Sequence, residues 1–569
     1  MKKLLFTILL FTFTFSISFG QSWAWGQDGI VKGTLPFIYG EGEGVTQDTK
    51  NDVLLTGYFS DSLQFGPYLL ISPRSTNITN VFLAKYNKNG VVKWARQSTN
   101  SNYNLQSVSV AADLNDNVFV MGNFIGTIYF GTLNVTSSTG DTYLVKYDST
   151  GNPLWIRQSL GGTQPVANGM ATDKWGNIYI TGLFRDSVVF GSYILRSPAY
   201  QLFLVKYSPN GNVLWAKQSS YACPDCSGVS NAVATDLSGN VFITGTADSI
   251  AIDTIKPKRG PVYIAKYDSG GNALWVSTAN IPRDTAGDVA IPTAITTDIA
   301  GNAIIGGSFN YLLIFGNDTL TGPSPQPFLN LADIFITKYT PGGNVDWITI
   351  GREIGFSMEN WSTYTLATDY NKNVYVTASS YPQGSEIQFG NDTLKCSGSA
   401  PEPTLLARFD STGKLTCGNI YPFAGDDWVG ITVDPSGNSI YLGGDLLEQT
   451  IFGTDTVPGS SNGENPFVAK WISCSNIETG ENSVGANKSV KVFPNPNNGI
   501  FTIQTLGTQN FVPATVEIYN VLGGKVYSQF NIQNSTINID LTGRPGGLYL
   551  YRILSQSGTL VGSGKFIIE

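Results

Sequence analysis

Histidine is absent from this sequence of 569 residues. Without it, the chain cannot build a Ser-His-Asp or Cys-His catalytic site, nor a zinc or iron site that uses histidine ligands. Charged residues are also scarce at 13 %, about half of the usual share, and the net charge of −8 disfavours nucleic acid and anionic membranes as partners. We therefore expect no catalysis and no cofactor, with calcium as the one cation to consider.

Long apolar runs are scarce as well. Residues 1–3 (Met-Lys-Lys) are basic, residues 4–15 are apolar apart from Thr, and residues 18–20 (Ser-Phe-Gly) place small side chains where a signal peptidase reads. The apolar run is too short to span a bilayer, and no later stretch is long enough. The pattern predicts a signal peptide over residues 1–20, cut before Gln21, and an extracytoplasmic mature chain with no membrane span.

Two short sequence phrases alternate through residues 22–473. The first is apolar-Lys-aromatic followed by a turn and a Trp, as in residues 143–147 (Tyr-Leu-Val-Lys-Tyr) with Trp155. The second is apolar-x-Thr-Asp, a short turn that ends in Asn, and a strand that closes on Thr-Gly. Seven copies with a period near sixty residues indicate a repeat fold. The turn aspartates are Asp48, Asp113, Asp173, Asp236, Asp298, Asp369 and Asp434.

Each copy has the pattern of four short strands, which we call A to D, joined by turns rich in Gly and Asn. Four antiparallel strands repeated seven times predict an all-β fold, a seven-bladed β-propeller over residues 21–473. The seventh copy lacks strand D, and residues 22–26 (Ser-Trp-Ala-Trp-Gly) look like that strand in other copies. We expect this N-terminal strand to close the last blade and remove an open sheet edge.

The repeated side chains have structural interpretations. Trp of strand D and Tyr of strand C are expected to pack between neighbouring blades. The repeated Lys is expected to keep its stem packed and its ammonium group in water. The Asp-containing turns lack the ligand spacing of a calcium loop, so they are interpreted as tight turns.

The unit in residues 233–245 and 262–275 resembles the bacterial β-propeller repeat found in secreted proteins. It also faintly resembles quinoprotein propeller repeats. Those enzymes need a quinone, a calcium site and usually an adjacent cysteine pair, and no adjacent pair exists here.

The C-terminal part is a separate domain by its composition. Residues 474–489 are small and polar and predict a linker, and the short strands of residues 490–569 predict a small β-sandwich. Its motifs closely resemble the type A C-terminal sorting domain of the type IX secretion system of Bacteroidetes, which implies export through that machinery to the cell surface or the medium. An ordinary β-sandwich binding module is the alternative. The motif residues are Pro494, Asn495, Pro496, Gly499, Phe501, Gly547, Leu548 and Tyr549.

Five cysteines in an exported chain allow two pairs and one remainder. Cys223 and Cys226 lie in a loop between blades, which favours a local disulfide over a redox motif. Cys396 and Cys417 fall in one copy and could bridge, which leaves Cys474.

The D–A and B–C connections vary in length and share one face, where recognition is expected. Their carboxylates and aromatic rings suit a glycan or a cation such as calcium, and a solvated rim is the alternative. The expected function is that of a secreted or cell-surface binding protein, monomeric, with a glycan or a surface protein as partner. The rival is a polysaccharide hydrolase or lyase that pairs Glu353 with Asp426 or Asp427 as acid and base. The candidate ligand-binding residues are Trp361, Glu359, Glu353, Asp426, Asp427 and Trp428.

Overall fold

A computed structural model of the chain divides it into two compact units, one over Gln21–Ser473 and one that contains Cys474–Glu569. The signal peptide expected over residues 1–20 and the linker expected over residues 474–489 lie outside the described residues. The structure describes residues 22–32, 40–72, 79–100, 106–162, 165–220, 228–247, 249–257, 260–281, 289–310, 312–322, 332–353, 360–381, 386–396, 403–422, 429–447, 449–453, 455–459, 464–472, 490–494, 497–505, 515–520, 524–530, 536–554 and 560–568.

Every secondary-structure element within these ranges is a β-strand, which confirms the all-β prediction. Accordingly, the described residues hold no helix long and apolar enough to cross a membrane. Seven antiparallel sheets in the first unit share one four-stranded order, A-B-C-D.

The strands of these sheets are given in A-B-C-D order. Sheet 1 is β3 (Gly40–Gln47), β4 (Val53–Phe59), β7 (Asn80–Tyr86) and β8 (Val92–Gln97); sheet 2 is β10 (Gln106–Ala112), β11 (Val118–Phe130), β12 (Leu133–Tyr147) and β13 (Pro153–Gln158). Sheet 3 is β14 (Val166–Thr172), β15 (Ile178–Phe190), β16 (Tyr193–Tyr207) and β17 (Val213–Gln218); sheet 4 is β18 (Gly228–Thr235), β19 (Val241–Ala247), β20 (Val262–Tyr267) and β21 (Ala273–Asn280). Sheet 5 is β22 (Ala290–Thr297), β23 (Ala303–Phe309), β26 (Asp333–Tyr339) and β27 (Val345–Glu353); sheet 6 is β28 (Asn360–Thr368), β29 (Val374–Tyr381), β32 (Thr404–Phe409) and β33 (Leu415–Tyr421); sheet 7 is β34 (Val429–Val433), β35 (Ile440–Leu446), β38 (Asn465–Ile472) and β1 (Ser22–Asp28).

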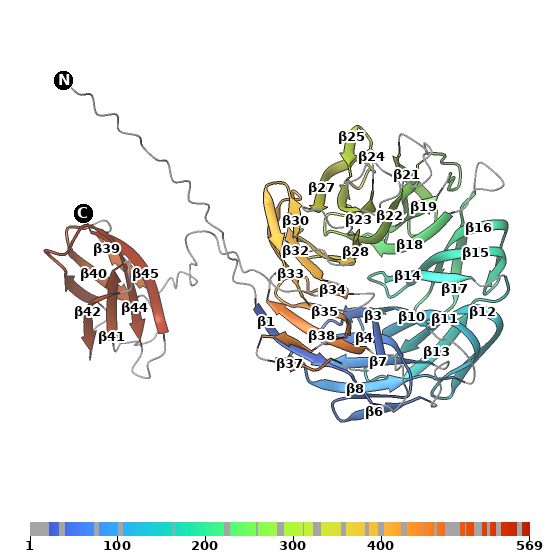
Figure 1. The fold of residues 1–569 in the computed structure, drawn as a ribbon, viewed down its shortest axis with the longest axis horizontal. Coiled ribbons are helices and arrows are strands. Elements are labelled where there is room, and N and C mark those ends of the chain that lie inside the picture. The colour runs from blue at the N-terminus through green and yellow to red at the C-terminus, as the bar shows by residue number, and fades with distance from the viewer. Residues whose placement is uncertain are drawn as a thin grey trace, which may run out of the picture. The chain divides into compact units, whose positions relative to one another are not determined.

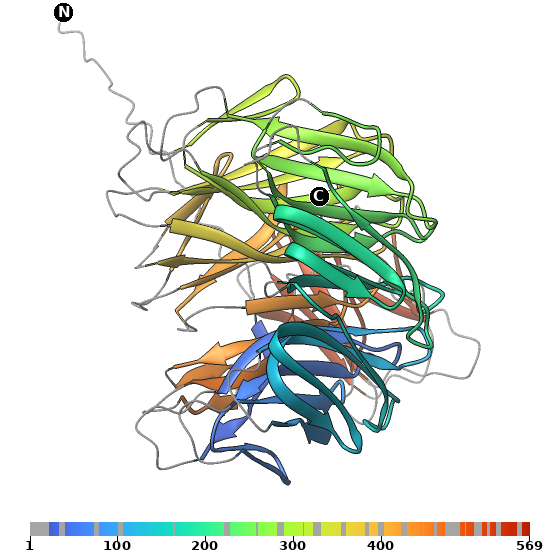
Figure 2. The same cartoon turned by 90° about the vertical axis from the view of Figure 1, so that its right-hand side faces the viewer.

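The sheets of the first unit radiate from a common centre (Figure 1), and a view from the side shows them beside one another (Figure 2). The A strands of successive sheets are in contact from β3 through β10, β14, β18, β22 and β28 to β34, and β34 contacts β3 in turn. This is the arrangement of a β-propeller, with the A strands around the centre and the D strands at the rim.

The N-terminal strand completes sheet 7. β1 pairs antiparallel with β38, with Trp23 opposite Trp471 and Asp28 opposite Phe467. The buried ring of Trp25 lies 5.7 Å from that of Tyr441 in the same sheet. The prediction that residues from the N-terminus supply the missing strand is confirmed.

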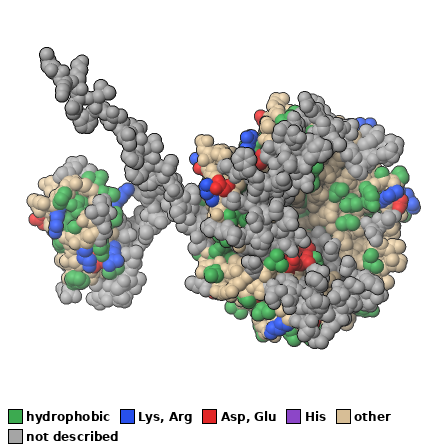
Figure 3. All heavy atoms as spheres, viewed as in Figure 1, with side chains coloured by type: hydrophobic (Ala, Val, Ile, Leu, Met, Phe, Trp, Pro, Cys, Tyr) green, Lys and Arg blue, Asp and Glu red, His purple; other side chains and the backbone are tan. Residues whose placement is uncertain are grey.

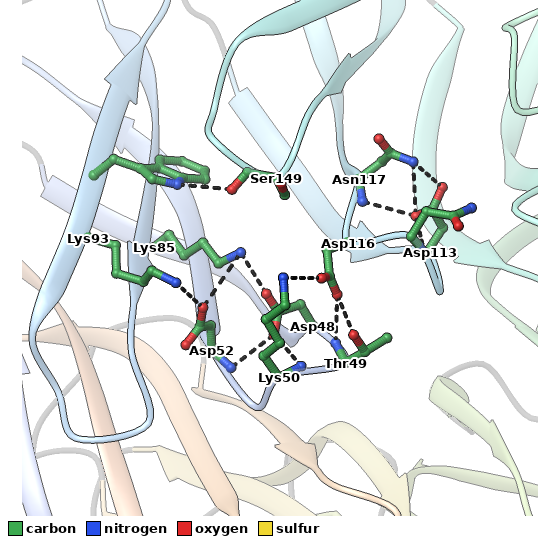
Figure 4. Close-up of polar contacts among 12 residues, drawn as sticks. Asp48, Thr49, Lys50, Asp52, Lys85, Lys93, Asp113, Asp116, Asn117 and Ser149 are labelled. Atoms are coloured by element: carbon green, nitrogen blue, oxygen red, sulfur yellow. Dashed lines mark hydrogen bonds and ion pairs between the residues drawn. The ribbon is translucent and has the colours of Figure 1, made fainter.

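In six of the seven D strands a Trp reaches the next sheet, which confirms its packing role; β33 of sheet 6 has Cys417 at this position. The indole Nε1–H of each Trp donates to a backbone carbonyl in the C–D turn of the following sheet (Figure 4 draws the first such contact). These bonds are Trp94 to Ser149 at 3.3 Å, Trp155 to Pro209 at 3.3 Å, Trp215 to Ser269 at 3.2 Å, Trp275 to Pro341 at 3.0 Å, Trp347 to Ser411 at 3.0 Å and Trp25 to Lys88 at 3.2 Å.

The repeated Lys is buried in sheets 1 to 5, so the expectation of an ammonium group in water is wrong there, whereas Lys470 of sheet 7 is half-buried. Lys85, Lys146, Lys206, Lys266 and Lys338 are at most 7 % exposed. Four of them donate to the carbonyl that the Trp also contacts, for example Lys206 to Ser269 at 2.9 Å. In sheet 1, Lys85 instead pairs with the turn carboxylate of Asp48 at 2.6 Å (Figure 4). The ammonium group is therefore satisfied by a carbonyl or a carboxylate in place of water.

The turn aspartates close the A–B turns, as expected from turn chemistry. Asp113 accepts the backbone N–H groups of Asn115 and Asn117 at 2.9 Å and the amide of Asn117 at 2.8 Å. Asp236 and Asp298 make the same set of bonds. Each of these carboxylates thereby receives its hydrogen bonds from its own turn.

The B–C connections vary in length, as expected, but they contain β-hairpins, so the expectation of loops is wrong. In six sheets the hairpin turns at a Phe-Gly pair whose glycine has φ between +52° and +65°. Sheets 2 and 3 extend their B and C strands into the hairpin. The separate hairpins are β5 (Ser62–Phe65) with β6 (Tyr68–Ile71), β24 (Leu312–Phe315) with β25 (Asp318–Thr321), β30 (Glu386–Phe389) with β31 (Asp392–Lys395), and β36 (Thr450–Phe452) with β37 (Asp455–Val457).

These hairpins also join neighbouring sheets. β24 pairs with β21 of sheet 4, and β30 pairs with β27 of sheet 5. Two short strands, β2 (Ile30–Val31) and β9 (Thr99–Asn100), follow D strands and pair with β5 and β11 of the next sheet. In β21 and β27 the hairpin pairs with the outer end of the D strand, where Ala279 and Gly351 also pair with the C strand, so the hairpins bridge the rim.

The second unit consists of two antiparallel sheets around one core, as a β-sandwich requires. Phe501 and Phe566 meet in that core with ring centroids 4.2 Å apart, and Tyr549 stacks on Phe566 at 5.7 Å. One sheet is β39 (Val490–Phe493), β40 (Ile500–Thr505) and β43 (Thr536–Asp540); the other is β42 (Lys525–Phe530), β41 (Thr515–Asn520), β44 (Gly547–Leu554) and β45 (Leu560–Ile568).

The C–D turn contact allows a matched pair of substitutions. A Cβ at Gly343, where φ is +86°, would lie 2.7 Å from the Trp275 ring, whereas a Cβ at Gly342 would meet nothing closer than 4.0 Å. Gly343→Ala should lower the free energy of unfolding by about 1–3 kcal/mol, because the left-handed backbone and the crowded ring both oppose a side chain. Gly342→Ala should change it by less than about 0.5 kcal/mol. Urea denaturation of both variants measures the difference, and equal effects would contradict the contact.

The closing strand predicts a pH dependence. Burial raises the pKa of Asp28 from 3.8 to about 6, and its Oδ2 has no hydrogen-bond partner among the described residues. As pH rises from 4 to 6, the unfolded chain loses this proton first, so the group destabilises the fold by up to roughly 3 kcal/mol above pH 6. Asp28→Asn should therefore stabilise the protein relative to wild type at pH 8 and not at pH 4. Thermal unfolding at the two pH values tests this, and a pH-independent difference would refute it.

Candidate functional site

A cavity of about 230 Å³ lies at the centre of the first unit. All seven A strands contribute to its wall, so it is the central channel of the ring. Glu43 is the only ionisable side chain among its described lining residues. The other polar side chains of the wall are Ser109, Asn168, Asn231, Thr293 and Thr365.

β-Bulges place most of these side chains. The pairing of A with B shifts register at Glu43, Asn168, Asn231 and Thr293, each five residues before the turn aspartate. A bulge bends the strand and redirects the extra side chain. Asn168 then donates to the carbonyl of Ser230 at 3.0 Å, and Asn231 donates to that of Pro292 at 2.7 Å. The amides thus join neighbouring A strands, and Glu43 stands among neutral groups.

A second feature of β3 is a group of carboxylates around Tyr58. Its hydroxyl donates to Glu41, and burial together with the charges of Glu41, Glu43 and Glu464 raises the Tyr58 pKa well above its usual value. Figure 3 shows acidic side chains gathered over the region where Figure 1 places β3. Glu41 and Glu43 precede the first turn aspartate and belong to the A strand that lines the channel, not to a D–A loop.

The sequence-predicted ligand residues are only partly described. Glu353 is the last residue of β27 and pairs with Ile387, and Trp361 in β28 pairs with Ser380. Glu359, Asp426, Asp427 and Trp428 lie outside the described residues, and the proposed site stays a prediction. In the described ranges no group of three Asp, Glu, His or Cys side chains is placed to hold a metal ion, and calcium likewise stays a prediction.

The prediction of a disulfide between Cys396 and Cys417 is wrong. Cys417 is disulfide-bonded, whereas Cys396 is free. Cys396 lies opposite Ile420 of β33, three residues along from Cys417, and at about 3.3 Å per residue this separation exceeds what a disulfide can span. Cys396 also follows β31, which belongs to the hairpin on sheet 5, so the two residues are not in one sheet. Cys223 and Cys226 lie outside the described residues.

Comparison with protein families identifies both parts of the chain. Residues 491–569 match the model of a secretion system C-terminal sorting domain, and residues 154–183 match that of a β-propeller repeat. Both resemblances drawn from the sequence are confirmed. The sorting domain belongs to the type IX secretion system and implies export to the cell surface or the medium.

Individual relatives are distant. An uncharacterized WD repeat-containing protein of Acanthamoeba polyphaga mimivirus is 25 % identical over 351 residues, which is 47 % of this chain and 24 % of that protein. The chain thus spans about a quarter of the length of that curated relative.

Among solved structures, PorZ, a surface component of the type IX secretion system of Porphyromonas gingivalis, has 10 % identity and a TM-score of 0.20 over 93 % of this chain and 81 % of its own. An ulvan lyase has 10 % identity and a TM-score of 0.37 over 76 % and 96 %. A protein of unknown function from Dyadobacter fermentans has 8 % identity and a TM-score of 0.35 over 78 % and 98 %. These TM-scores are too low to carry an argument about activity.

The sorting motifs hold the sandwich together. Phe501 is buried in the core, and the Tyr549 hydroxyl donates to the Pro545 carbonyl at 2.8 Å. Gly499 and Gly547 have φ of +97° and +146°, where side chains are disfavoured, and Leu548 is exposed. Pro494 follows β39, and Asn495 and Pro496 lie outside the described residues.

Removing residues 490–569 should abolish export. The truncated chain keeps the whole first unit, so it should fold but remain inside the outer membrane, while wild type reaches the surface or the medium. Fractionation of cells and medium with an antibody against the first unit measures this. Truncated chain secreted at the wild-type level would contradict a sorting role.

Proposed function

We propose that this chain is an exported, non-catalytic binding protein whose seven-bladed, closed propeller presents a ligand site at the mouth of its central channel. The ring of A-strand contacts and the pairing of β1 with β38 support the blade count and the closure. The matched sorting domain supports its place outside the outer membrane after a periplasmic stage.

The composition of the channel is the observation that carries the binding function. General acid–base hydrolysis needs two ionisable groups with separated pKa values, and the described wall offers Glu43 alone. The hydrolase or lyase alternative depends on Glu353 with Asp426 or Asp427, and no observation of the described residues favours it.

The chemistry around the channel favours a ligand rich in hydroxyl groups. Ser109 and Thr293 can both donate and accept hydrogen bonds, and Glu43 accepts only. A glycan end or a hydrated cation presents the matching O–H donors. The neighbouring Glu41 and Glu464 add negative charge, which would repel an anionic ligand.

A glycan array incubated with the full chain tests this proposal. Neutral glycans should bind, and Glu43→Gln should weaken binding at least tenfold, because the half-buried side chain loses its negative charge and one of its two acceptor oxygens. Asp318→Asn, which removes an exposed carboxylate on the rim, is the matched control and should bind like wild type. Absence of any bound glycan or cation, or an undiminished signal for Glu43→Gln, would refute the site. Cleavage of the glycans, seen by mass spectrometry, would favour the enzyme.

A further inference from the structure

A second cavity, of about 560 Å³, lies at the rim between sheets 5 and 6, and we call it the rim cleft. Its walls come from three elements: β27 of sheet 5, the turn of the β30–β31 hairpin, and the C–D turn of sheet 6. The volume falls within the range of small-molecule sites.

The rim cleft is open because the residue at its edge has a short side chain, whereas the equivalent residues of sheets 1 and 2 are arginines that cover this place. Two residues after the D-strand Trp, Arg96 covers the next C–D turn and donates to the carbonyls of Gly151 and Thr150, both at 2.9 Å. Arg157 does the same with Gly211 at 2.8 Å. The equivalent residue of sheet 5 is Thr349, whose hydroxyl reaches Gly413 at 2.6 Å. The carbonyl is thus satisfied without a guanidinium group over the turn.

The hairpin provides a second, independent observation. In sheets 2 and 3 a Cβ on the turn glycine would contact the D strand of the same sheet, at 3.2 Å from Pro153 for Gly131 and at 3.1 Å from Val213 for Gly191. A Cβ on Gly390, like one on Gly316 in sheet 5, would meet nothing within 4 Å. The hairpin of sheet 6 therefore stands away from its D strand, where Leu415 lines the space instead.

The charges in the rim cleft differ from those of the protein as a whole. Arg352 and Lys414 contribute two cations against the one carboxylate of Asp392, in a chain of net charge −8. Arg352 is exposed and forms no ion pair with a described side chain. The rim cleft is thus an electropositive place suited to an anionic group.

The remaining lining narrows the class of ligand. Asp392 accepts hydrogen bonds only, and Gln388 and Asn391 both donate and accept, so the ligand should carry O–H donors as well as its anion. Apolar groups of Ile350 and Leu415 suit the C–H face of a ring. Phe389 is 3 % exposed and offers no stacking surface for a base. From this geometry we infer that the rim cleft binds an acidic saccharide, a sugar unit that bears a carboxylate or a sulfate.

This site is separate from the channel site proposed above, and its test uses the full chain and defined probes. Isothermal calorimetry would compare tetragalacturonate, a sulfated carrageenan tetrasaccharide, maltotetraose and a tetraglutamate peptide. At least one acidic saccharide should bind, at least tenfold more tightly than maltotetraose and the peptide. Which of the two binds distinguishes a carboxylate from a sulfate. Binding of neither, or equally tight binding of the peptide, would overturn the inference.

Thr349→Arg recreates the arrangement of sheets 1 and 2 and tests the location. It should weaken binding at least tenfold although it adds a positive charge, because the guanidinium group would occupy the rim cleft. Ser277→Arg makes the same change at the equivalent position of sheet 4 and should leave binding within twofold of wild type. Arg352→Gln replaces an exposed side chain and should also weaken binding. It tests the location if Thr349→Arg does not fold. Wild-type affinity in Thr349→Arg, or in Arg352→Gln if only that variant folds, would overturn the assignment.

Discussion

The hydrogen bond from a D-strand indole to the C–D turn of the next sheet is the contact on which the first unit depends. A single four-stranded sheet exposes two faces and cannot bury both by itself, so each sheet needs neighbours on either side. The Trp ring covers the turn glycine of the next sheet, as Trp215 covers Gly271, while its N–H satisfies a carbonyl there. The buried Lys donates to the same carbonyl. One turn of the next sheet therefore both covers the apolar ring and accepts the hydrogen bonds of the indole and the ammonium group.

This contact also decides which face can vary. The A–B and C–D turns are closed by Asp, Asn and Gly and pressed against the neighbouring sheet, so they tolerate little change. The described beginnings of the D–A connections pair with the hairpin of the next sheet, as β2 and β9 do, and the bulged A strands that follow aim Glu43, Asn168 and Asn231 at the channel. A scaffold of this kind fixes the position of a binding site without contributing to its chemistry. The rim cleft follows the same logic, since it opens where Thr349 replaces a longer side chain.

Much of the fold could be predicted because its repeats are visible in the sequence. The Asp, Lys and Trp spacings located the strands, and the likeness of residues 22–26 to a D strand located the closure. The Phe-Gly pairs of the B–C hairpins recur as regularly, at Phe65, Phe130 and Phe190, and they were the available signal for the missed hairpins. The burial of Lys could not be inferred, because its partner carbonyl belongs to the next copy.

The central claim is that the sheets form one ring closed by β1, and amide hydrogen exchange of the full chain tests it most directly. β1 is paired with β38 and anchored to the next sheet through Trp25. Ser22–Asp28 should therefore be protected as strongly as the D strands β8, β13 and β17, for hours under native conditions. Exchange of this segment within seconds, while those three strands stay protected, would contradict the closed ring.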